Sequence, residues 1–335
     1  MPSATSAAPI PVYLLTGFLG SGKTTLLARL VHSREFADTA VVINEFGEVG
    51  LDHVLVGQSS EDDIVLLDSG CLCCASNNSL QETLESLYYR RLRGEIPAFS
   101  RIVVETSGLA EPAPLINALA SDASIARHVR LAGVITTIDA EHGAATLDEY
   151  ETAATQLAVA DLVVLTKTDK VAPEAASAMA GQLRRQAPGA PVLRADRDGL
   201  QERTDLFQAA DRRTVAPGQF GLERPRAWTR LAHVLRYGIA SHVIRADGPV
   251  DWARYAAWVD YMQSRLGERL LRVKGILLME DGAHYAIHGV RHVFSPPRPL
   301  DGEVPGDLSG VLVLITRDAD EEELALAAAV LDGGA

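Results

Sequence analysis

Cysteine is scarce in this sequence, because its 335 residues contain three. All three lie within four positions, at Cys71, Cys73 and Cys74. A disulfide framework joins distant segments of a chain, so three clustered cysteines exclude one. They fit a reducing compartment better.

Long apolar runs are also absent, since none reaches the roughly 18 residues that a membrane-spanning helix needs. Lysine and arginine are missing before Lys23, whereas a signal peptide or a transit peptide requires basic residues there. We therefore expect a cytoplasmic protein that does not bind a membrane, with residues 1–10 as a flexible tail.

Positive charge is in deficit: 31 Lys and Arg face 44 Asp and Glu, for a net charge of −13. Affinity for nucleic acid depends on Lys and Arg, so this balance argues against a nucleic-acid partner. Aromatic residues make up 5% of the chain, but the apolar fraction of 47% is ample for real cores. The length suits about two domains.

Short apolar runs rich in β-branched residues alternate with helical patterns as far as residue 205. This alternation predicts an α/β domain over residues 11–210, with a mostly parallel sheet covered by helices. The predicted strands are Val12–Thr16, Ala40–Asn44, Ile64–Leu67, Arg101–Thr106, Ala132–Ile138, Asp161–Thr166 and Pro191–Arg194. The predicted helices include Leu80–Arg93, Asp148–Ala160 and Glu174–Gln186.

The alternation stops after residue 205. Residues 211–228 are charged and carry prolines and glycines, which predicts a linker. Residues 229–335 then predict a smaller α+β domain with an antiparallel sheet. Its expected helices are Asp251–Leu266 and Asp320–Leu331, and its expected strands are Leu270–Met279, His284–Phe294 and Val311–Thr316.

Residues 17–24 read Gly-Phe-Leu-Gly-Ser-Gly-Lys-Thr, which is the spacing of a phosphate-binding P-loop between a strand and a helix. Backbone N–H groups of such a loop and the helix N-terminus attract phosphate. We expect Lys23 to reach the β- and γ-phosphates and to stabilise charge during transfer, and the Thr24 hydroxyl to hold Mg²⁺. The expected nucleotide-binding residues here are Gly20, Ser21, Gly22, Lys23, Thr24 and Thr25.

Glu105 ends an apolar strand, and Gly108 follows three residues later. This resembles the Asp-x-x-Gly element of GTPases with Glu in place of Asp. Glu105 could hold a Mg²⁺-bound water, and the Gly108 N–H could sense the γ-phosphate. The alternative is an ordinary capped strand end.

Residues 166–169 read Thr-Lys-Thr-Asp after another apolar strand. The Asp169 carboxylate can accept two N–H groups from guanine, a pair that adenine lacks, and the Lys167 stem can lie along the purine face. Thr166 stands where Asn is usual, so we expect weaker bracing of the loop. The segment favours GTP over ATP, and an ATPase remains the alternative.

Asn44-Glu45-Phe46-Gly47-Glu48 follows the second strand, where the first switch of a GTPase would lie. Glu45 could orient water for catalysis, and Glu48 could contribute an oxygen ligand to a metal. The alternative is an acidic turn, which this segment by itself favours.

The three cysteines supply thiolates, which are soft ligands suited to Zn²⁺ and similar ions. Cys73 and Cys74 are adjacent, so both can ligate one ion only if the backbone turns sharply. Three thiolates leave a tetrahedral ion one ligand short, which suits metal transfer better than a closed structural site. A redox pair and inert buried thiols are the alternatives.

Taken in order, these motifs resemble the CobW family of P-loop GTPases. The similarity covers about residues 11–331 and includes Gly70-Cys-Leu-Cys-Cys74, Glu105-Thr-Ser-Gly-Leu-Ala-Glu-Pro112 and Leu270-Leu-Arg-Val-Lys-Gly-Ile276. It implies that Cys71, Cys73 and Cys74, with Glu48, bind Zn²⁺ or Co²⁺, and that hydrolysis of GTP to GDP is coupled to delivery of the metal to a client protein. The rival function is a GTP-dependent activator or scaffold for a metalloenzyme or cobalamin pathway complex, with a structural metal. A homodimer is an assembly that the sequence allows.

The sequence departs from the family pattern at three places. The linker lacks a His-rich tract, which argues against metal storage, and Cys74 precedes an uncharged segment, which suggests a distinct client. His288 stands before Gly289, where relatives often have Gln. His284, His288 and His292 are interpreted as half-exposed residues of one strand, in which four residues span about 13 Å, too far to share one ion.

Overall fold

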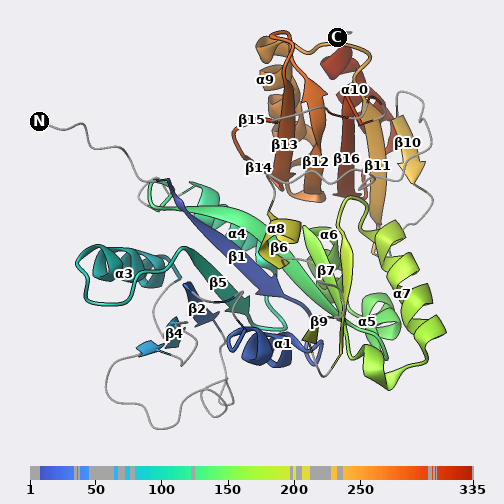
Figure 1. Ribbon diagram of the computed structural model, residues 1–335. Helices are drawn as coiled ribbons and strands as arrows, with labels where there is room; N and C mark the ends of the chain where they lie inside the picture. The colour runs from blue at the N-terminus through green and yellow to red at the C-terminus, as the bar shows by residue number, and fades with distance from the viewer. Residues whose placement is uncertain are drawn as a thin grey trace, which may run out of the picture.

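The computed structural model describes residues 8–33, 36, 38–44, 64–66, 72–75, 80–121, 125–196, 199–200, 206–211, 228–231, 237–300, 304, 306 and 308–333. These residues form two sheets, each covered by helices (Figure 1). None of the helices within these ranges has both the length and the apolar character needed to cross a lipid bilayer.

The first sheet has the strand order β3-β4-β2-β5-β1-β6-β7-β8-β9. Neighbouring strands from β4 to β8 run parallel, while β3 and β9 pair antiparallel at the two edges. The central strands β5 and β7 are buried along almost their whole length and are largely apolar, as expected where helices cover both faces of a sheet. The strands are β1 (Ile10–Thr16), β2 (Thr39–Asn44), β3 (Ile64–Leu66), β4 (Leu72–Ala75), β5 (Arg101–Thr106), β6 (Val129–Asp139), β7 (Leu162–Thr166), β8 (Val192–Asp196) and β9 (Gly199–Leu200).

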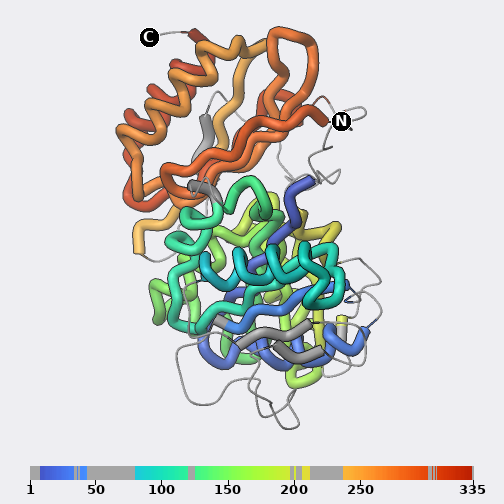
Figure 2. Tube along the Cα trace, turned by 90° about the vertical axis from the view of Figure 1, so that its left-hand side faces the viewer, coloured from blue at the N-terminus to red at the C-terminus, as the bar shows by residue number. Residues whose placement is uncertain are grey.

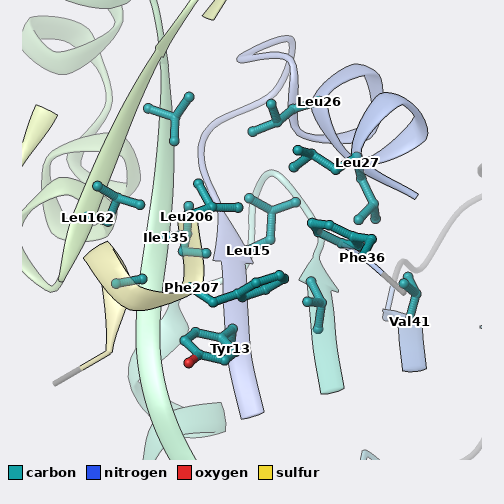
Figure 3. Packing of buried hydrophobic residues seen from close by; sticks show 14 of the residues in the cluster. Tyr13, Leu15, Leu26, Leu27, Phe36, Val41, Ile135, Leu162, Leu206 and Phe207 are labelled. Atoms are coloured by element: carbon teal, nitrogen blue, oxygen red, sulfur yellow. The ribbon is translucent and has the colours of Figure 1, made fainter. Parts of the chain in front are cut away.

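Hydrophobic clusters on both faces hold the helices against this sheet. On one face, Phe207 packs between Tyr13 and Phe36, with ring centroids 4.9 Å from each (Figure 3). On the other face, Leu84 and Ile116 belong to a second buried cluster. The helices are α1 (Lys23–Leu30), α3 (Leu80–Leu92), α4 (Pro112–Ser121), α5 (Gly143–Glu149), α6 (Glu151–Ala158), α7 (Pro173–Gln186) and α8 (Leu206–Ala210), with the short 3₁₀ helix η2 (Thr168–Lys170).

The second sheet is antiparallel, with the order β10-β11-β16-β12-β13-β14 and β15 paired to β13. Helices α9 (Trp252–Tyr261) and α10 (Glu321–Asp332) lie together on one face, around the fully buried Trp258 (Figure 2). Asp320 caps α10 in a reciprocal capping box with Glu323. The strands are β10 (Trp228–Leu231), β11 (Ile239–Arg245), β12 (Leu270–Leu278), β13 (His284–Val290), β14 (Val293–Phe294), β15 (Arg298–Pro299) and β16 (Val311–Arg317).

Buried charged groups join the second sheet to the first. Arg272 Nη2 on β12 donates to Asp161 Oδ1 at 2.6 Å, and both side chains are almost fully buried. Asp161 Oδ2 also accepts the N–H of Val134, so the carboxylate connects both sheets. Lys274 Nζ on β12 donates to the carbonyl of Gly189 at 3.1 Å.

The α/β class with an antiparallel C-terminal sheet is confirmed, but three predicted elements differ. The helix expected over Asp148–Ala160 is two helices, because Tyr150 between them is extended (φ −117°, ψ 115°). The strand expected over His284–Phe294 is a hairpin, which turns at Arg291 with φ 51°. Leu72–Ala75 in the cysteine segment forms a strand, whereas ligation of one ion by both Cys73 and Cys74 requires a sharp turn there.

Candidate nucleotide-binding site

The loop between β1 and α1 is held tightly against β6. A β-carbon at Gly17 (φ 145°) would lie 2.3 Å from Thr137 Oγ1, so a side chain at this position would clash with β6. Gly22 caps α1 in the left-handed conformation without a side-chain cap. The first N–H groups of α1 therefore remain available to a phosphate group.

Lys23 folds back over the loop. Its side chain is buried at 6% exposure, and Nζ donates to the carbonyls of Gly17 (2.9 Å) and Phe18 (3.3 Å). These contacts keep the ammonium group close to the backbone that the sequence predicts to surround phosphate. The position suits an ammonium group that exchanges a carbonyl contact for phosphate oxygens.

Thr24 and Glu105 meet beside this loop. Thr24 Oγ1 donates to Glu105 Oε1 at 2.7 Å, and Glu105 is 1% exposed. Glu105 reaches the loop because β5 pairs with β1 in a register that sets Glu105 opposite Leu15. A hydroxyl and a carboxylate are the oxygen ligands that Mg²⁺ prefers, so the pair fits that ion.

Hydroxyl groups at the ends of adjacent strands brace the loop. Ser21 Oγ lies 2.7 Å from Thr137 Oγ1, and Thr166 Oγ1 donates to the carbonyl of Ser21 at 2.6 Å. Thr166 does contact the loop directly, and its hydroxyl also reaches the carbonyl of Ile138. Thr137 was missed in the sequence, although threonine at a predicted strand end beside a P-loop was a visible signal.

Lys167 adopts a left-handed backbone (φ 56°), and its Nζ donates to Asp139 Oδ2 at 2.6 Å. Burial raises the pKa of Asp139, but the hydrogen bonds from Lys167 and from the N–H groups of Glu141 and His142 outweigh it, so the pKa lies below its usual value. The charged pair fixes the lysine stem at the carboxyl end of the sheet. Asp139 was not predicted, because its partner is 28 residues away in the chain.

Other predicted residues lie around the same loop. Gly108 is packed so tightly that a β-carbon there would lie 2.8 Å from the backbone nitrogen of Leu19. Gly20 and Thr25 are exposed, and Asp169 is exposed on η2. The carboxyl ends of β1, β5, β6 and β7 thus bring the predicted nucleotide-binding residues together.

The predicted metal site lies largely outside the described residues, which exclude Glu45, Glu48 and Cys71. The backbone of Cys73 and Cys74 belongs to β4, which pairs parallel with β2 and antiparallel with β3. Within the part of the chain that the structure describes, no group of three His, Cys, Asp or Glu side chains could hold a metal ion.

The three C-terminal histidines do not share one strand. His284 and His288 lie on β13, whereas His292 is exposed in the turn before β14. His284 Nε2 lies 3.0 Å from Ser309 Oγ, and His288 is buried at 8% exposure. The interpretation of three half-exposed strand residues is therefore wrong for His288 and His292, because the chain turns at Arg291.

Comparison with known proteins agrees with this geometry. Residues 11–194 match the family described as CobW/HypB/UreG, nucleotide-binding domain, and residues 239–330 match the cobalamin synthesis protein cobW C-terminal domain. The chain is 32% identical to the zinc chaperone YjiA of Escherichia coli over 329 residues, covering 96% of this chain and 99% of that protein. It is 27% identical to the zinc-regulated GTPase metalloprotein activator 1 of Schizosaccharomyces pombe, covering 85% of this chain and 76% of that protein.

Solved structures agree as well. The crystal structure of Zn(II)-bound YjiA GTPase from E. coli matches with a TM-score of 0.68 and 30% identity, over 96% of this chain and 99% of that one. The similarity to YjiA, in sequence and in fold, thus extends over nearly the whole chain. The protein belongs to the CobW family of P-loop GTPases.

Proposed function

We propose that this GTPase is a metallochaperone that binds a transition metal, in the first place Zn²⁺, at Cys71, Cys73 and Cys74 and delivers it to a client metalloprotein. The observation that carries the proposal is the position of the cysteine strand relative to the Thr24–Glu105 pair. In the sheet, β4 lies beside β2, and β2 lies beside β5, which ends near Glu105. Two relatives named as zinc proteins support the choice of metal.

The register of these strands sets the cysteine segment level with the nucleotide site. Ile43 on β2 pairs with Ala75 on one side and with Glu105 on the other. Adjacent strands are about 4.8 Å apart, so the backbones at 75 and 105 are about 10 Å apart. A shift of β2 would therefore reach both the cysteine strand and Glu105.

For the GTPase step, the proposed roles follow from the contacts. Lys23 binds the β- and γ-phosphate oxygens, and the N–H groups at the start of α1 hold the β-phosphate. Thr24 and Glu105 hold Mg²⁺, which neutralises charge on the phosphates when bound. Gly108 contacts the γ-phosphate, and Glu45 orients the attacking water.

Base recognition is assigned to Thr166, Lys167 and Asp169. The Lys167–Asp139 pair keeps the lysine stem in place, and the exposed Asp169 carboxylate is free to accept N1–H and N2–H of guanine. We further propose that residues 11–210 act as the GTPase domain, that 211–228 link it to the domain at 229–335, and that the protein works on a client away from membranes and nucleic acid.

Replacing Asp169 with Asn should weaken GTP binding by about 100-fold, because two hydrogen bonds to a charged acceptor are altered. Xanthosine triphosphate should bind the variant better than GTP, since its base carries a carbonyl in place of the guanine amino group. Competition against a fluorescent guanine nucleotide measures both affinities. Glu174→Gln, which removes an exposed carboxylate on α7, is the matched control. If the wild-type protein binds ATP as tightly as GTP, guanine recognition is refuted.

Replacing Cys73 with Ser should lower zinc affinity by at least about 100-fold, because loss of an outer partner of a metal ligand already costs 10–100-fold. The measurement is a titration of Zn²⁺ and Co²⁺ into metal-free protein, with GTP, with GDP and without nucleotide. His292→Gln removes an exposed potential ligand elsewhere and should leave the affinity unchanged. Wild-type affinity in the Cys73 variant would refute the site.

The same titration separates the chaperone from the rival scaffold. A chaperone must bind zinc with different affinity in the GTP and GDP states. Zinc must then change the ratio of GTP affinity to GDP affinity by the same factor. A scaffold with a structural metal should bind zinc equally in both states. Its melting temperature should fall on chelation, and it should activate its client without metal transfer.

A further inference from the structure

The loop at residues 107–111, which joins β5 to α4, is held by one buried side chain from α6. Gln156 Nε2 donates to the carbonyls of Gly108 (3.2 Å) and Ala110 (3.0 Å), and the residue is fully buried. The backbone carbonyl of Gln156 in turn accepts a hydrogen bond from Thr136 Oγ1 on β6 at 3.0 Å. The loop expected to sense the γ-phosphate is thus attached to the helix that carries Gln156.

The amide of Gln156 is only half satisfied in this arrangement. Oε1 has no hydrogen-bond partner among the described residues. Turning the amide over would set its oxygen against two carbonyl oxygens, so the NH₂ group must face the loop. A buried acceptor without a donor disfavours this position of the loop, and a shift that offers Oε1 an N–H would remove the penalty.

Helix α6 also contacts the C-terminal sheet. Arg317 Nη2 on β16 lies 3.1 Å from Thr155 Oγ1 and 2.9 Å from Glu151 Oε1. Ala154 and Ala158 pack against a buried cluster of Ile239, Leu271 and Ile315. Adjacent residues of one helix therefore hold the loop and the second sheet.

A second connection runs from the loop itself. Glu111 Oε2 accepts from Arg291 Nη2 at 2.9 Å, and Arg291 forms the turn between β13 and β14. Arg291 Nη1 also lies 3.6 Å from Glu268, so this guanidinium lies between carboxylates of the two domains. Helix α4, which follows the loop, contacts β13 and β14.

We propose that Gln156 is a positioning residue for the GTPase reaction, and that α6 and the Glu111–Arg291 pair couple the position of the 107–111 loop to the C-terminal sheet. When the γ-phosphate engages Gly108, the carbonyls at 108 and 110 shift relative to Gln156. That shift moves the contacts that α6 and Glu111 make with Arg317 and Arg291 of the C-terminal domain. The position of the C-terminal sheet therefore favours one nucleotide state over the other, and the sheet moves during the GTPase cycle. The inference rests on the proposed contact of Gly108 with the γ-phosphate.

The test compares Gln156→Met, which keeps the approximate volume of the side chain and removes both donors, with Gln156→Glu, which replaces the NH₂ group by an oxygen. We expect kcat to fall about tenfold, the scale of typical coupling between sites, while the Kd for GDP changes less than twofold. Binding of a non-hydrolysable GTP analogue should weaken relative to GDP. A purely structural residue would lower both affinities equally, and that result, like an unchanged ratio of the two affinities, would overturn the proposal.

The coupling to the C-terminal sheet has its own test in Glu111→Gln, Arg291→Gln and the double variant. Each single change should alter the ratio of GTP-analogue to GDP affinity, and the double change should add nothing further, because the pair acts as one unit. Arg269→Gln, which breaks an ion pair with Glu323 inside the C-terminal domain, is the matched control. An unchanged ratio in the Glu111 and Arg291 variants would overturn the coupling.

These measurements use the full chain with Mg²⁺ and without added transition metal. If zinc proves to have no effect on nucleotide binding while the Gln156 and Arg291 variants behave as expected, the metallochaperone proposal fails and the positioning role stands. If the wild-type protein shows zinc coupling and the variants behave as wild type, only the positioning role fails.

Discussion

Lys23→Met should reduce kcat/KM for GTP by about 10³-fold, because loss of one group that stabilises developing charge in a transition state costs about 10²–10³ in rate. Lys23 is 6% exposed, and its ammonium donates to the carbonyls of Gly17 and Phe18. Methionine keeps the length of the stem and removes the charge. Phosphate release under saturating and subsaturating GTP gives kcat and KM separately.

A matched control is Arg127→Met, which removes an exposed cation from the turn before β6. It should leave kcat/KM unchanged, so that a loss in the Lys23 variant cannot be attributed to net charge. Circular dichroism spectra of the two variants should agree. Turnover within threefold of wild type in the Lys23 variant would be incompatible with the assigned role.

Arg272→Met should destabilise the folded protein by about 3–5 kcal/mol, which is the usual result of removing one partner of a buried ion pair. Asp161 would then remain at 1% exposure without its guanidinium, with Oδ2 still bonded to Val134. At about 2–4 °C per kcal/mol for a domain of 150–250 residues, the midpoint of thermal unfolding should fall by about 6–20 °C.

The exposed pair Arg93–Glu95 provides the comparison, and Arg93→Gln should not change the midpoint measurably. The double variant Asp161→Asn with Arg272→Met should be less destabilised than the sum of its single changes, because neither charge is left alone. A midpoint for the Arg272 variant within 2 °C of wild type would show that the buried pair does not hold the two domains together.

Much of the nucleotide site was predictable because its motifs are local. The P-loop needs glycines and a lysine at set spacings between a strand and a helix, and the structure sets Gly22 and Lys23 at the start of α1 as expected. Runs of apolar residues such as Leu162–Thr166 likewise predict buried parallel strands. The elements that were missed, such as β4 and β11, are set by pairing with distant strands.

The contacts that complete the site join residues far apart in the chain. Gln156 reaches the 107–111 loop from 46 to 48 residues away, and Lys167 meets Asp139 across 28 residues. Neither polar residue carries a spacing that marks it, since a glutamine within a helical pattern suits a solvent-exposed face equally well. Burial against the 107–111 loop, which no local pattern records, gives Gln156 its importance.

The sequence alone therefore determined the P-loop and the alternation of strands and helices in the first domain, because both depend on local spacing and periodicity, and its ordered motifs carried the resemblance to a GTPase family. Only the tertiary structure decided which residues meet. Strand order brought Glu105 to Thr24, and a turn at Arg291 separated His292 from the strand that holds His284 and His288. The docking of a second sheet made Arg272 and Arg291 partners of acids from the first domain, because hydrogen bonding and charge pairing depend on distance in space and not on distance along the chain.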